Sequence, residues 1–314
     1  MKKKNREAGH REMDQSLLVF VTVAEKGSFS RAAEQLHMTQ PAVSQQIQAL
    51  ERGLGTRLLE RNNKYVRLNK AGEIVYHHAK EILGLHGRMR DLVNDLLHTP
   101  SGNLVIGASY TFGEYVLPHV IARMRERYPL IRPSISIHNT KEIVELVQNR
   151  QLDVGIVEGE CRDDKLSIEP FADDEMQIIA SPAHRLAGRD SAAIPELEEE
   201  TWIVREEGSG TREAADKMFD RLAFRPESLM EFGSTQIIKE SVEAGLGVSL
   251  LSTWAIRKEL KLGTLTIIRH PEMPIRRKFS LVTQANPFHT KALEIFLELV
   301  RHDEVVTTGA GESE

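Results

Sequence analysis

The stretch SRAAEQLHMTQPAVSQQIQALE, residues 30–51, places two helical patterns on either side of a tight turn. The first pattern can be capped by Ser28 or by Ser30, because a hydroxyl in the N-cap position accepts a free backbone N–H. Thr39 caps the second pattern, and Pro41 occupies its first turn, where the missing N–H is harmless. Two short helices joined in this way predict a helix-turn-helix, whose second helix enters the major groove of DNA.

The second helix of this motif has two chemically different faces. Apolar residues recur at helical spacing and form the predicted inward face: Val43, Ile47, Leu50 and Leu54. Polar residues form the outward face: Gln40, Ser44, Gln45, Gln48 and Arg52. Amide and hydroxyl groups both donate and accept hydrogen bonds, and Gln can pair with the edge of adenine. An ordinary polar surface is the alternative, and the turn with its caps favours DNA recognition.

The segment after this helix is strongly basic. Between Arg52 and Lys70 the sequence holds six Lys or Arg residues and one acidic residue, Glu60. RLLER and KYVRL alternate like two short strands, and the NN pair between them is a turn signal. The sequence therefore predicts a hairpin, a wing beside the recognition helix, whose tip contacts phosphate or the minor groove.

Charge is distributed unevenly along the chain. Residues 1–98 carry 16 Lys and Arg against 11 Asp and Glu, whereas the remaining residues carry 25 against 35. A basic N-terminal part on an acidic body is expected of a DNA-binding head on a soluble sensor, and chance unevenness is the alternative. A single cysteine, Cys161, excludes an intrachain disulfide, and no apolar run reaches the roughly 20 residues that span a bilayer. These features predict a cytoplasmic protein.

A long helix is predicted over residues 70–97, capped by Asn69. Seven of its residues follow a heptad spacing: Val75, His78, Ile82, Leu85, Met89, Leu92 and Leu96. Such a seam favours a dimerisation helix, and packing of the helix on its own domain is the alternative. His78 is interpreted as a packing or register residue of the seam rather than as a ligand.

Beyond the hinge HTPSGNL, residues 98–104, predicted strands alternate with helices. This alternation predicts an α/β domain with largely parallel sheets. Hydroxyl-bearing or cationic residues follow several of the strands: Ser109, Thr111, Thr140, Arg205, Ser209, Thr211, Arg212 and Thr235. Because helix N-termini present free N–H groups, we expect these residues to converge on one small anion in the cleft of the domain. The alternative for each hydroxyl taken alone is a helix N-cap, so the expectation rests on their joint placement.

Other classes of function find less support. The chain has no G-x-S-x-G elbow, no Cys and His spacing of a zinc site and no Walker phosphate loop. We therefore expect no catalytic residue, no metal ligand and no cofactor, and no enzyme activity. A ligand-binding solute receptor without DNA function is the main alternative. The helix-turn-helix argues against it, and salt-sensitive operator binding in a gel shift would distinguish the two.

Residues 13–98 resemble the N-terminal winged helix-turn-helix and linker helix of the LysR-type transcriptional regulators. The resemblance rests on FVTVAEKGSFSRAAEQLHMTQPAVSQQIQALE, LGTRLLER and AGE. It implies groove contacts at the positions matching Gln40, Pro41 and Ser44, whereas Gln45 stands where many members have Arg. Lys64 matches a basic residue at the tip of the wing. The predicted DNA-binding residues are Ser30, Thr39, Gln40, Pro41, Ser44, Gln45, Gln48, Arg52, Arg61 and Lys64.

The resemblance implies the organisation of the whole chain. It predicts a disordered leader (1–12), a winged helix-turn-helix (13–69), a linker or dimerisation helix (70–98), an effector-binding domain (103–302) and a disordered tail (303–314). The effector-binding domain should resemble periplasmic binding proteins, with subdomain I over about 103–173 and 276–302 and subdomain II over about 174–275.

The implied function is transcription regulation by a homodimer or homotetramer. Its implied partners are operator DNA, RNA polymerase and a small, anionic effector. The stretch REEGSGTRE is similar to members that govern sulfur assimilation or carbon fixation, with sulfur metabolism favoured. The sequence leaves open the effector, the target genes and the choice between activation and repression at each promoter.

Overall fold

The computed structural model describes residues 15–61, 65–95, 100–285 and 288–302. The chain divides into two compact units, residues 1–91 and 92–314, and each is considered by itself. The predicted leader, the predicted tail and Lys64 of the wing tip lie outside the described residues. Within the described ranges, no helix is both long and apolar enough to cross a membrane.

The first unit, called the head, begins with a helix over residues 15–26. It is followed by α2 (Phe29–Gln35) and α3 (Gln40–Leu54). Ser28 rather than Ser30 caps α2, because its Oγ accepts a hydrogen bond from an amide in the first turn of that helix. The two helices confirm the predicted helix-turn-helix.

The turn and the cap of α3 follow the sequence pattern closely. His37 adopts a positive φ of 52° in the turn. The Thr39 side chain accepts a hydrogen bond from a backbone amide in the first turn of α3. Three of the four residues predicted to face inward are buried: Val43, Ile47 and Leu50. Leu54 is 49% exposed, contrary to prediction, because it ends the helix beyond the core, directly before the left-handed Gly55.

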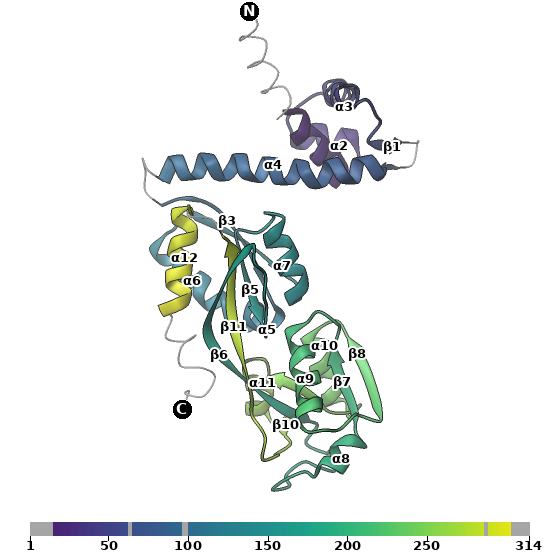
Figure 1. The fold of residues 1–314 in the computed structure, drawn as a ribbon, viewed down its shortest axis with the longest axis vertical. Helices are drawn as coiled ribbons and strands as arrows, with labels where there is room; N and C mark the ends of the chain where they lie inside the picture. The colour runs from purple at the N-terminus through teal and green to yellow at the C-terminus, as the bar shows by residue number, and fades with distance from the viewer. Residues whose placement is uncertain (1–14, 62–64, 96–99, 286–287, 303–314) are drawn as a thin grey trace, which may run out of the picture. The chain divides into compact units, whose positions relative to one another are not determined.

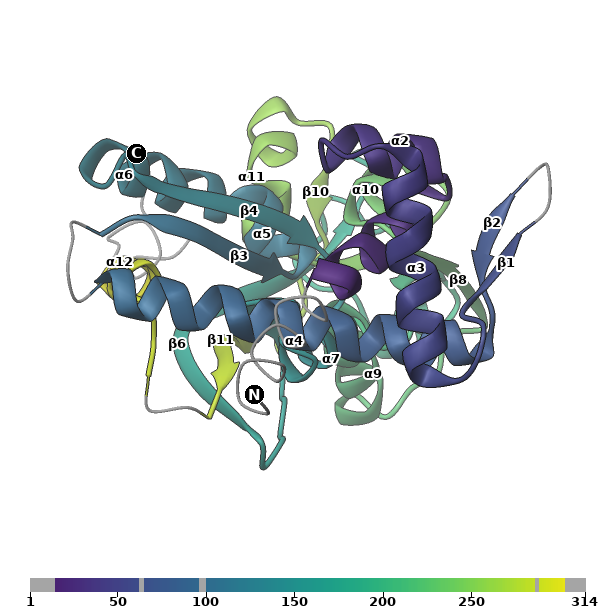
Figure 2. The same ribbon diagram turned by 90° about the horizontal axis from the view of Figure 1, so that it is seen from above.

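The predicted wing is a short antiparallel hairpin. β1 (Leu59–Arg61) pairs with β2 (Val66–Leu68), and Leu59 lies opposite Leu68. Figure 2 shows the hairpin projecting to one side of α3. Leu58 and Leu59 are buried in the head core, so the apolar residues of the wing anchor it to the helices.

The long helix α4 (Lys70–Asp95) is capped by Asn69, whose Oδ1 accepts a hydrogen bond from an amide of the first turn at 2.8 Å. Its N-terminal part packs on the head through Ala79 and Val75, so Val75 does not belong to a free seam. Five apolar residues of the helix are exposed: Ile74, Ile82, Leu85, Met89 and Val93. Leu96, the last predicted seam residue, lies outside the described residues.

The second unit, called the sensor, alternates strands with helices. Its strands are β3 (Gly102–Ala108), β4 (Ile131–Ile137), β5 (Val154–Glu158), β6 (Leu166–Ala180), β7 (Thr201–Arg205), β8 (Ser228–Phe232), β9 (Ser249–Ser252), β10 (Thr266–Ile267) and β11 (Ile275–Gln284). Its helices are α5 (Tyr110–Tyr115), α6 (Leu117–Arg127), α7 (Thr140–Gln148), α8 (Ile194–Glu198), α9 (Gly210–Arg221), α10 (Thr235–Glu243), α11 (Thr253–Leu262) and α12 (Lys291–His302).

Two long strands, β6 and β11, connect two groups of elements (Figure 1). Lobe I comprises residues 102–158 and 291–302, and lobe II comprises residues 194–267. β3 pairs in parallel with β4 and β5 in lobe I, and β7 pairs in parallel with β8 in lobe II. β6 and β11 pair antiparallel, because one strand leaves lobe I and the other returns to it. The expectation of largely parallel sheets therefore holds within the lobes and fails for the connecting strands.

Each lobe has a core that holds its strand ends in place. Ile106, Phe112 and Phe296 belong to the core of lobe I. The core of lobe II contains Trp202 and Phe219, whose ring centroids are 5.0 Å apart in an edge-on arrangement. Loops between β-strand ends and helix starts are consequently fixed relative to the sheets, and these loops carry the polar residues singled out in the sequence.

Candidate functional site

The outward face of α3 is a polar surface. Gln40, Gln45 and Gln48 are exposed and Ser44 is half-buried. Arg52 is exposed too, and its Nε donates a hydrogen bond to the Gln48 carbonyl at 3.2 Å. The further predicted contacts with described side chains are also exposed: Ser30, Thr39 and Pro41. The last two predicted contacts, the side chain of Arg61 and residue Lys64, lie outside the described part of the structure.

A hollow of about 840 Å³ lies between α3 and the wing, and the sequence did not indicate it. It is lined by Gln48, Glu51, Arg57, Leu59, Glu60, Tyr65 and Asn69. The Glu51 carboxylate accepts the Leu58 amide at 2.9 Å and so ties the start of the wing to α3. The Arg67 guanidinium lies 5.0 Å from the centre of the Tyr65 ring, and this cation–π contact positions a positive charge on the wing. Helix and wing therefore form one candidate DNA interface.

In the sensor, three of the predicted threonines contact Glu158, a buried residue at the end of β5. The Thr111 amide donates to Glu158 Oε1 at 2.9 Å, and the Thr211 hydroxyl donates to Oε2 at 3.3 Å. The Thr140 hydroxyl donates to the Glu158 backbone carbonyl at 3.1 Å. Three of the predicted residues therefore meet at an acidic residue that belongs to the protein.

Arg277 of β11 completes this cluster. Its Nη1 lies 2.7 Å from Glu158 Oε2, and its Nε donates to Asp174 Oδ2 at 2.7 Å. Its Nη2 donates to the Thr111 hydroxyl at 3.1 Å. Ser252 donates to the other oxygen of Asp174 at 2.5 Å. One buried guanidinium thus faces two buried carboxylates, and it joins lobe I, lobe II and both connecting strands.

The two carboxylates of this cluster have opposite pKa shifts. Burial raises the pKa of Glu158, but the charge of Arg277 and hydrogen bonds from Thr111 outweigh it, so the pKa falls below its ordinary value. Burial also raises the pKa of Asp174, and there Arg277 and Ser252 offset only part of the effect. The Arg277 guanidinium faces both acids. Its charge contributes to an overall lowering of the pKa of Glu158, but it does not offset the effect of burial on the pKa of Asp174.

The glycine of the GSGT stretch permits this packing. Gly210 is the first residue of α9, and a Cβ placed on it would lie 2.2 Å from the Glu158 carbonyl oxygen. A side chain at this position would push α9 away from β5, and with it the Thr211 hydroxyl. The motif therefore serves close approach of two segments rather than phosphate binding.

A second buried guanidinium lies beside this cluster. Arg205, at the end of β7, is 1% exposed and stacks 4.1 Å from the centre of the Tyr110 ring. Glu206 binds it with both carboxylate oxygens, each at 2.7 Å from a guanidinium nitrogen. Its remaining nitrogen lies 3.4 Å from the Thr235 hydroxyl, and the Asn139 amide reaches Glu206 at 3.4 Å. Arg205 is thus held by a carboxylate from its own chain.

Two further predicted effector residues, Ser209 and Arg212, are bonded to groups of the protein itself. Ser209 Oγ caps the amide of Thr211 at 3.2 Å. The Arg212 guanidinium faces Asp216 and Glu231 at 3.1 and 2.8 Å, because α9 turns it towards these acids. Ser109 Oγ is buried and makes no hydrogen bond of normal geometry among the described residues. That these side chains meet at one external anion stays a prediction.

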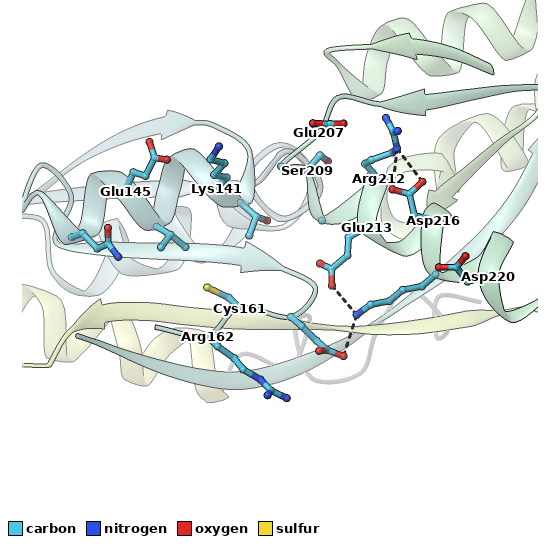
Figure 3. A pocket seen from close by; sticks show the side chains of 17 residues that line it. Lys141, Glu145, Cys161, Arg162, Glu207, Ser209, Arg212, Glu213, Asp216 and Asp220 are labelled. Atoms are coloured by element: carbon cyan, nitrogen blue, oxygen red, sulfur yellow. Dashed lines mark hydrogen bonds and ion pairs between the residues drawn. The ribbon is translucent and has the colours of Figure 1, made fainter. Parts of the chain in front are cut away.

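A groove of about 750 Å³ runs between α7 and α9 (Figure 3). Its walls combine basic and acidic side chains, including Lys141, Arg212, Glu213 and Asp216. Lys217 of lobe II bridges Glu213 and Glu160, at 2.7 and 3.1 Å, and so closes one side of the groove. Burial raises the pKa of Cys161 there, as do Asp163 and Glu213, so its thiol is kept protonated.

Comparisons with known families cover almost the whole chain. Residues 15–73 match the family described as bacterial regulatory helix-turn-helix protein, lysR family, and residues 98–304 match the LysR substrate binding domain. The chain belongs to the LysR family. It is a DNA-binding transcriptional regulator with an effector-binding domain. This family and the relatives below are transcriptional regulators, not enzymes, and the resemblance inferred from the sequence is confirmed.

Curated relatives fit the expected subset of the LysR family. The regulator CysL of Bacillus subtilis is 37% identical over 285 residues, which cover 91% of this chain and 95% of that protein. A probable RuBisCO transcriptional regulator of Cyanophora paradoxa is 35% identical, with 90% of each chain covered.

Solved structures show the same fold. Full-length CbnR complexed with its target DNA has a TM-score of 0.71 at 22% identity, covering 92% of this chain and 98% of that one. The regulatory domain of Synechocystis CcmR in complex with 2-PG is 30% identical with a TM-score of 0.58, covering 64% of this chain and 96% of that domain.

The central ionic residues of the sensor were missed in the sequence. Glu158, Asp174 and Arg277 lie in β5, β6 and β11, and no motif in the sequence marks any of them. One signal was present: the acidic run DDE (173–175) and the basic run RRK (276–278) lie on two connecting strands. In the fold these runs pair residue by residue, with Arg277 opposite Asp174. Complementary charges in two such strands could have revealed the pairing.

Proposed function

We propose that this regulator binds a small anionic metabolite beside Arg205, and that the bound anion replaces the carboxylate of Glu206. The observation that carries the proposal is the bidentate pair itself. A guanidinium that is 1% exposed requires an anionic partner, and Glu206 meets this need from a side chain that is 26% exposed. An exposed partner of a buried charge can be exchanged without opening the core.

The neighbourhood of Arg205 suits such a ligand. Tyr110 supplies a flat ring, while Asn139 and the Thr235 hydroxyl supply hydrogen-bonding groups. Tyr110 directly precedes Thr111 in α5, so a ligand at Arg205 adjoins the Glu158–Arg277 cluster that joins the two lobes. Binding there would alter how the lobes close, which is the coupling that an effector needs to influence DNA binding.

Sulfur metabolism is the favoured context for this effector. The relative named CysL supports it, whereas the RuBisCO regulators and the CcmR domain in complex with 2-PG support a phosphorylated acid of carbon metabolism. Both classes share an anionic group that a guanidinium binds with two parallel hydrogen bonds. We further propose that operator contacts are made by α3 and the wing, that α4 pairs two chains into a homodimer or homotetramer, and that RNA polymerase is a partner.

Calorimetric titration of the full chain tests the effector site. Sulfite, sulfate, O-acetylserine and 2-PG are the probes, and one of them should bind the wild type. Glu206→Gln should bind that probe about tenfold more tightly, because the competing carboxylate is neutralised. Thr235→Val should bind it more weakly. Operator affinity without the probe should stay unchanged in both variants.

Glu207→Gln is the matched control, since it removes the same charge one residue further along, at the groove between α7 and α9. A tightening equal to that of Glu206→Gln would show a general effect of charge. If both Glu206→Gln and Thr235→Val bound the probe like the wild type, the effector site would lie elsewhere.

A further inference from the structure

Three possible metal ligands lie together on the part of α4 that belongs to the head. Among the described residues, His77, His78 and Glu81 each offer one ligand atom, and these atoms lie within 4.8 Å of one another. His78 Nδ1 is 2.9 Å from Glu81 Oε2, and His77 Nε2 is 4.0 Å from Glu81 Oε1. The two imidazole rings meet edge-on with centroids 5.3 Å apart. Two ring nitrogens thus face one carboxylate.

Helix geometry alone produces this arrangement. With 3.6 residues per turn, position 81 lies between positions 77 and 78 when α4 is viewed along its axis. Helical side chains lean towards the N-terminus, so Glu81 reaches back over the turn that carries the two histidines. The three residues are therefore brought together whenever this part of the helix forms, without help from a distant segment.

The donor set matches a divalent transition metal. Two imidazoles and one carboxylate are a common set of zinc ligands, and three protein ligands leave a fourth position for water. Ligand atoms around a tetrahedral zinc ion are about 3.3 Å apart, given bond lengths near 2.0–2.1 Å. The two ring nitrogens lie 2.9 and 4.0 Å from different oxygens of Glu81, and the three ligand atoms lie within 4.8 Å of one another, so side-chain rotation has to bring them closer around one ion.

The surroundings leave the three ligands accessible. The side chains of His77, His78 and Glu81 are 42%, 64% and 30% exposed, so an ion and its water can enter. The cation closest in sequence, Lys80, is bound to Glu25 of the head at 2.9 Å, together with the Tyr76 hydroxyl. Lys80 therefore has a carboxylate of its own and does not neutralise Glu81.

We propose that His77, His78 and Glu81 bind one divalent transition-metal ion per chain, with Zn²⁺ as the representative ion. This proposal departs from the expectation that the sequence holds no metal ligand. The spacings of Cys and His typical of zinc sites do not include a set of two adjacent histidines and a glutamate. His78 also belongs to the predicted seam that includes Ile82 and Leu85, so the ion would sit beside the surface proposed to pair two chains.

The test is a titration of the full chain, first treated with a chelator, with ZnCl₂ by calorimetry at neutral pH. The wild type should bind one ion per chain, and ZnCl₂ should raise its melting temperature because the ion binds the folded helix. The double variant His77→Ala/His78→Ala should bind at least tenfold more weakly and lose the rise. Binding should weaken at acid pH, where protons compete for the imidazoles.

His86→Ala is the matched control, since it removes an imidazole from a different side of the same helix and should bind Zn²⁺ like the wild type. Operator binding of each variant verifies that the head has folded. Zinc binding by the double variant with wild-type affinity and stoichiometry would overturn the proposal, as would a wild type that binds no ion.

Discussion

The head and the sensor use their polar side chains in opposite ways. On α3, Gln40, Gln45 and Gln48 are exposed on a surface that faces away from the head core. In the sensor, Thr111 and Arg277 are only 2% and 7% exposed and are bonded to partners within the unit. Both sets consist of side chains that form hydrogen bonds. They differ in where the bonding partner comes from.

The difference follows from the cost of burial. An exposed amide is satisfied by water until DNA replaces the water, so a reading surface needs no internal partner. A buried polar group without a partner costs roughly 2–7 kcal/mol, and in the sensor Thr111 and Arg277 have partners within the unit. A site on the surface is therefore visible in a short stretch of sequence, whereas a buried site depends on residues far apart in the chain.

The largest effect is expected on the exposed seam of the head. Ile82→Asp combined with Leu85→Asp would place two unpaired charges in the proposed contact between two α4 helices. Each buried, uncompensated charge costs several kcal/mol, so pairing should weaken by roughly 6 kcal/mol or more. Light scattering of the full chain should show a fall from the mass of an oligomer towards that of one chain.

Arg90→Asp is the control, because it changes the net charge by the same amount from another side of α4. Its mass should equal that of the wild type. An unchanged mass for the double variant would show that the exposed apolar residues of α4 do not hold two chains together.

The next effect is expected in the buried cluster of the sensor. Arg277→Met keeps much of the side-chain volume and leaves Glu158 and Asp174 uncompensated. The free energy of unfolding of the sensor should fall by about 3–5 kcal/mol, measured by chemical denaturation. The neighbouring Arg276→Met removes an exposed pair with Glu175 and should cost about 0–1 kcal/mol. Equal losses for the two variants would contradict the role given to the buried cluster.

The smallest effect is expected on the reading surface of α3. Gln40→Ala should lose about 1–3 kcal/mol of discrimination at one base pair of the operator, with little change on random DNA. Arg52→Ala should instead weaken operator and random DNA alike and lower the salt dependence, as a phosphate contact does. Gel shifts over a series of salt concentrations measure both. Equal weakening on both DNAs for Gln40→Ala would make it a positioning residue.

The sequence predicted the head well because the relevant signals are local. Thr39, Pro41 and the apolar spacing of α3 lie within a few turns of each other, and helix caps act over three or four residues. Two residues of the head differ from the prediction because their burial depends on where the helices end and pack. Leu54 follows the apolar spacing but ends its helix beyond the core, and Val75 packs on the head instead of facing a partner.

The sensor was predicted only in outline. The alternation of strands and helices and the polar strand ends could be recognised, and Thr111, Thr140 and Thr211 do converge. What they converge on could not be recognised, because Glu158 and Arg277 are separated by over a hundred residues and meet only through strand pairing.

The sequence by itself therefore determined the winged helix-turn-helix, the long helix after it and the α/β class of the sensor, since these follow from periodicities and caps within short stretches. Only the tertiary structure decided which polar groups stay available to a partner. Arg205 is held by Glu206 and Arg212 is turned to Asp216, although the two arginines are only seven residues apart, one at the end of β7 and the other in the first turn of α9. Their roles differ because burial and neighbouring charge depend on the packing of the lobes, which no local pattern encodes.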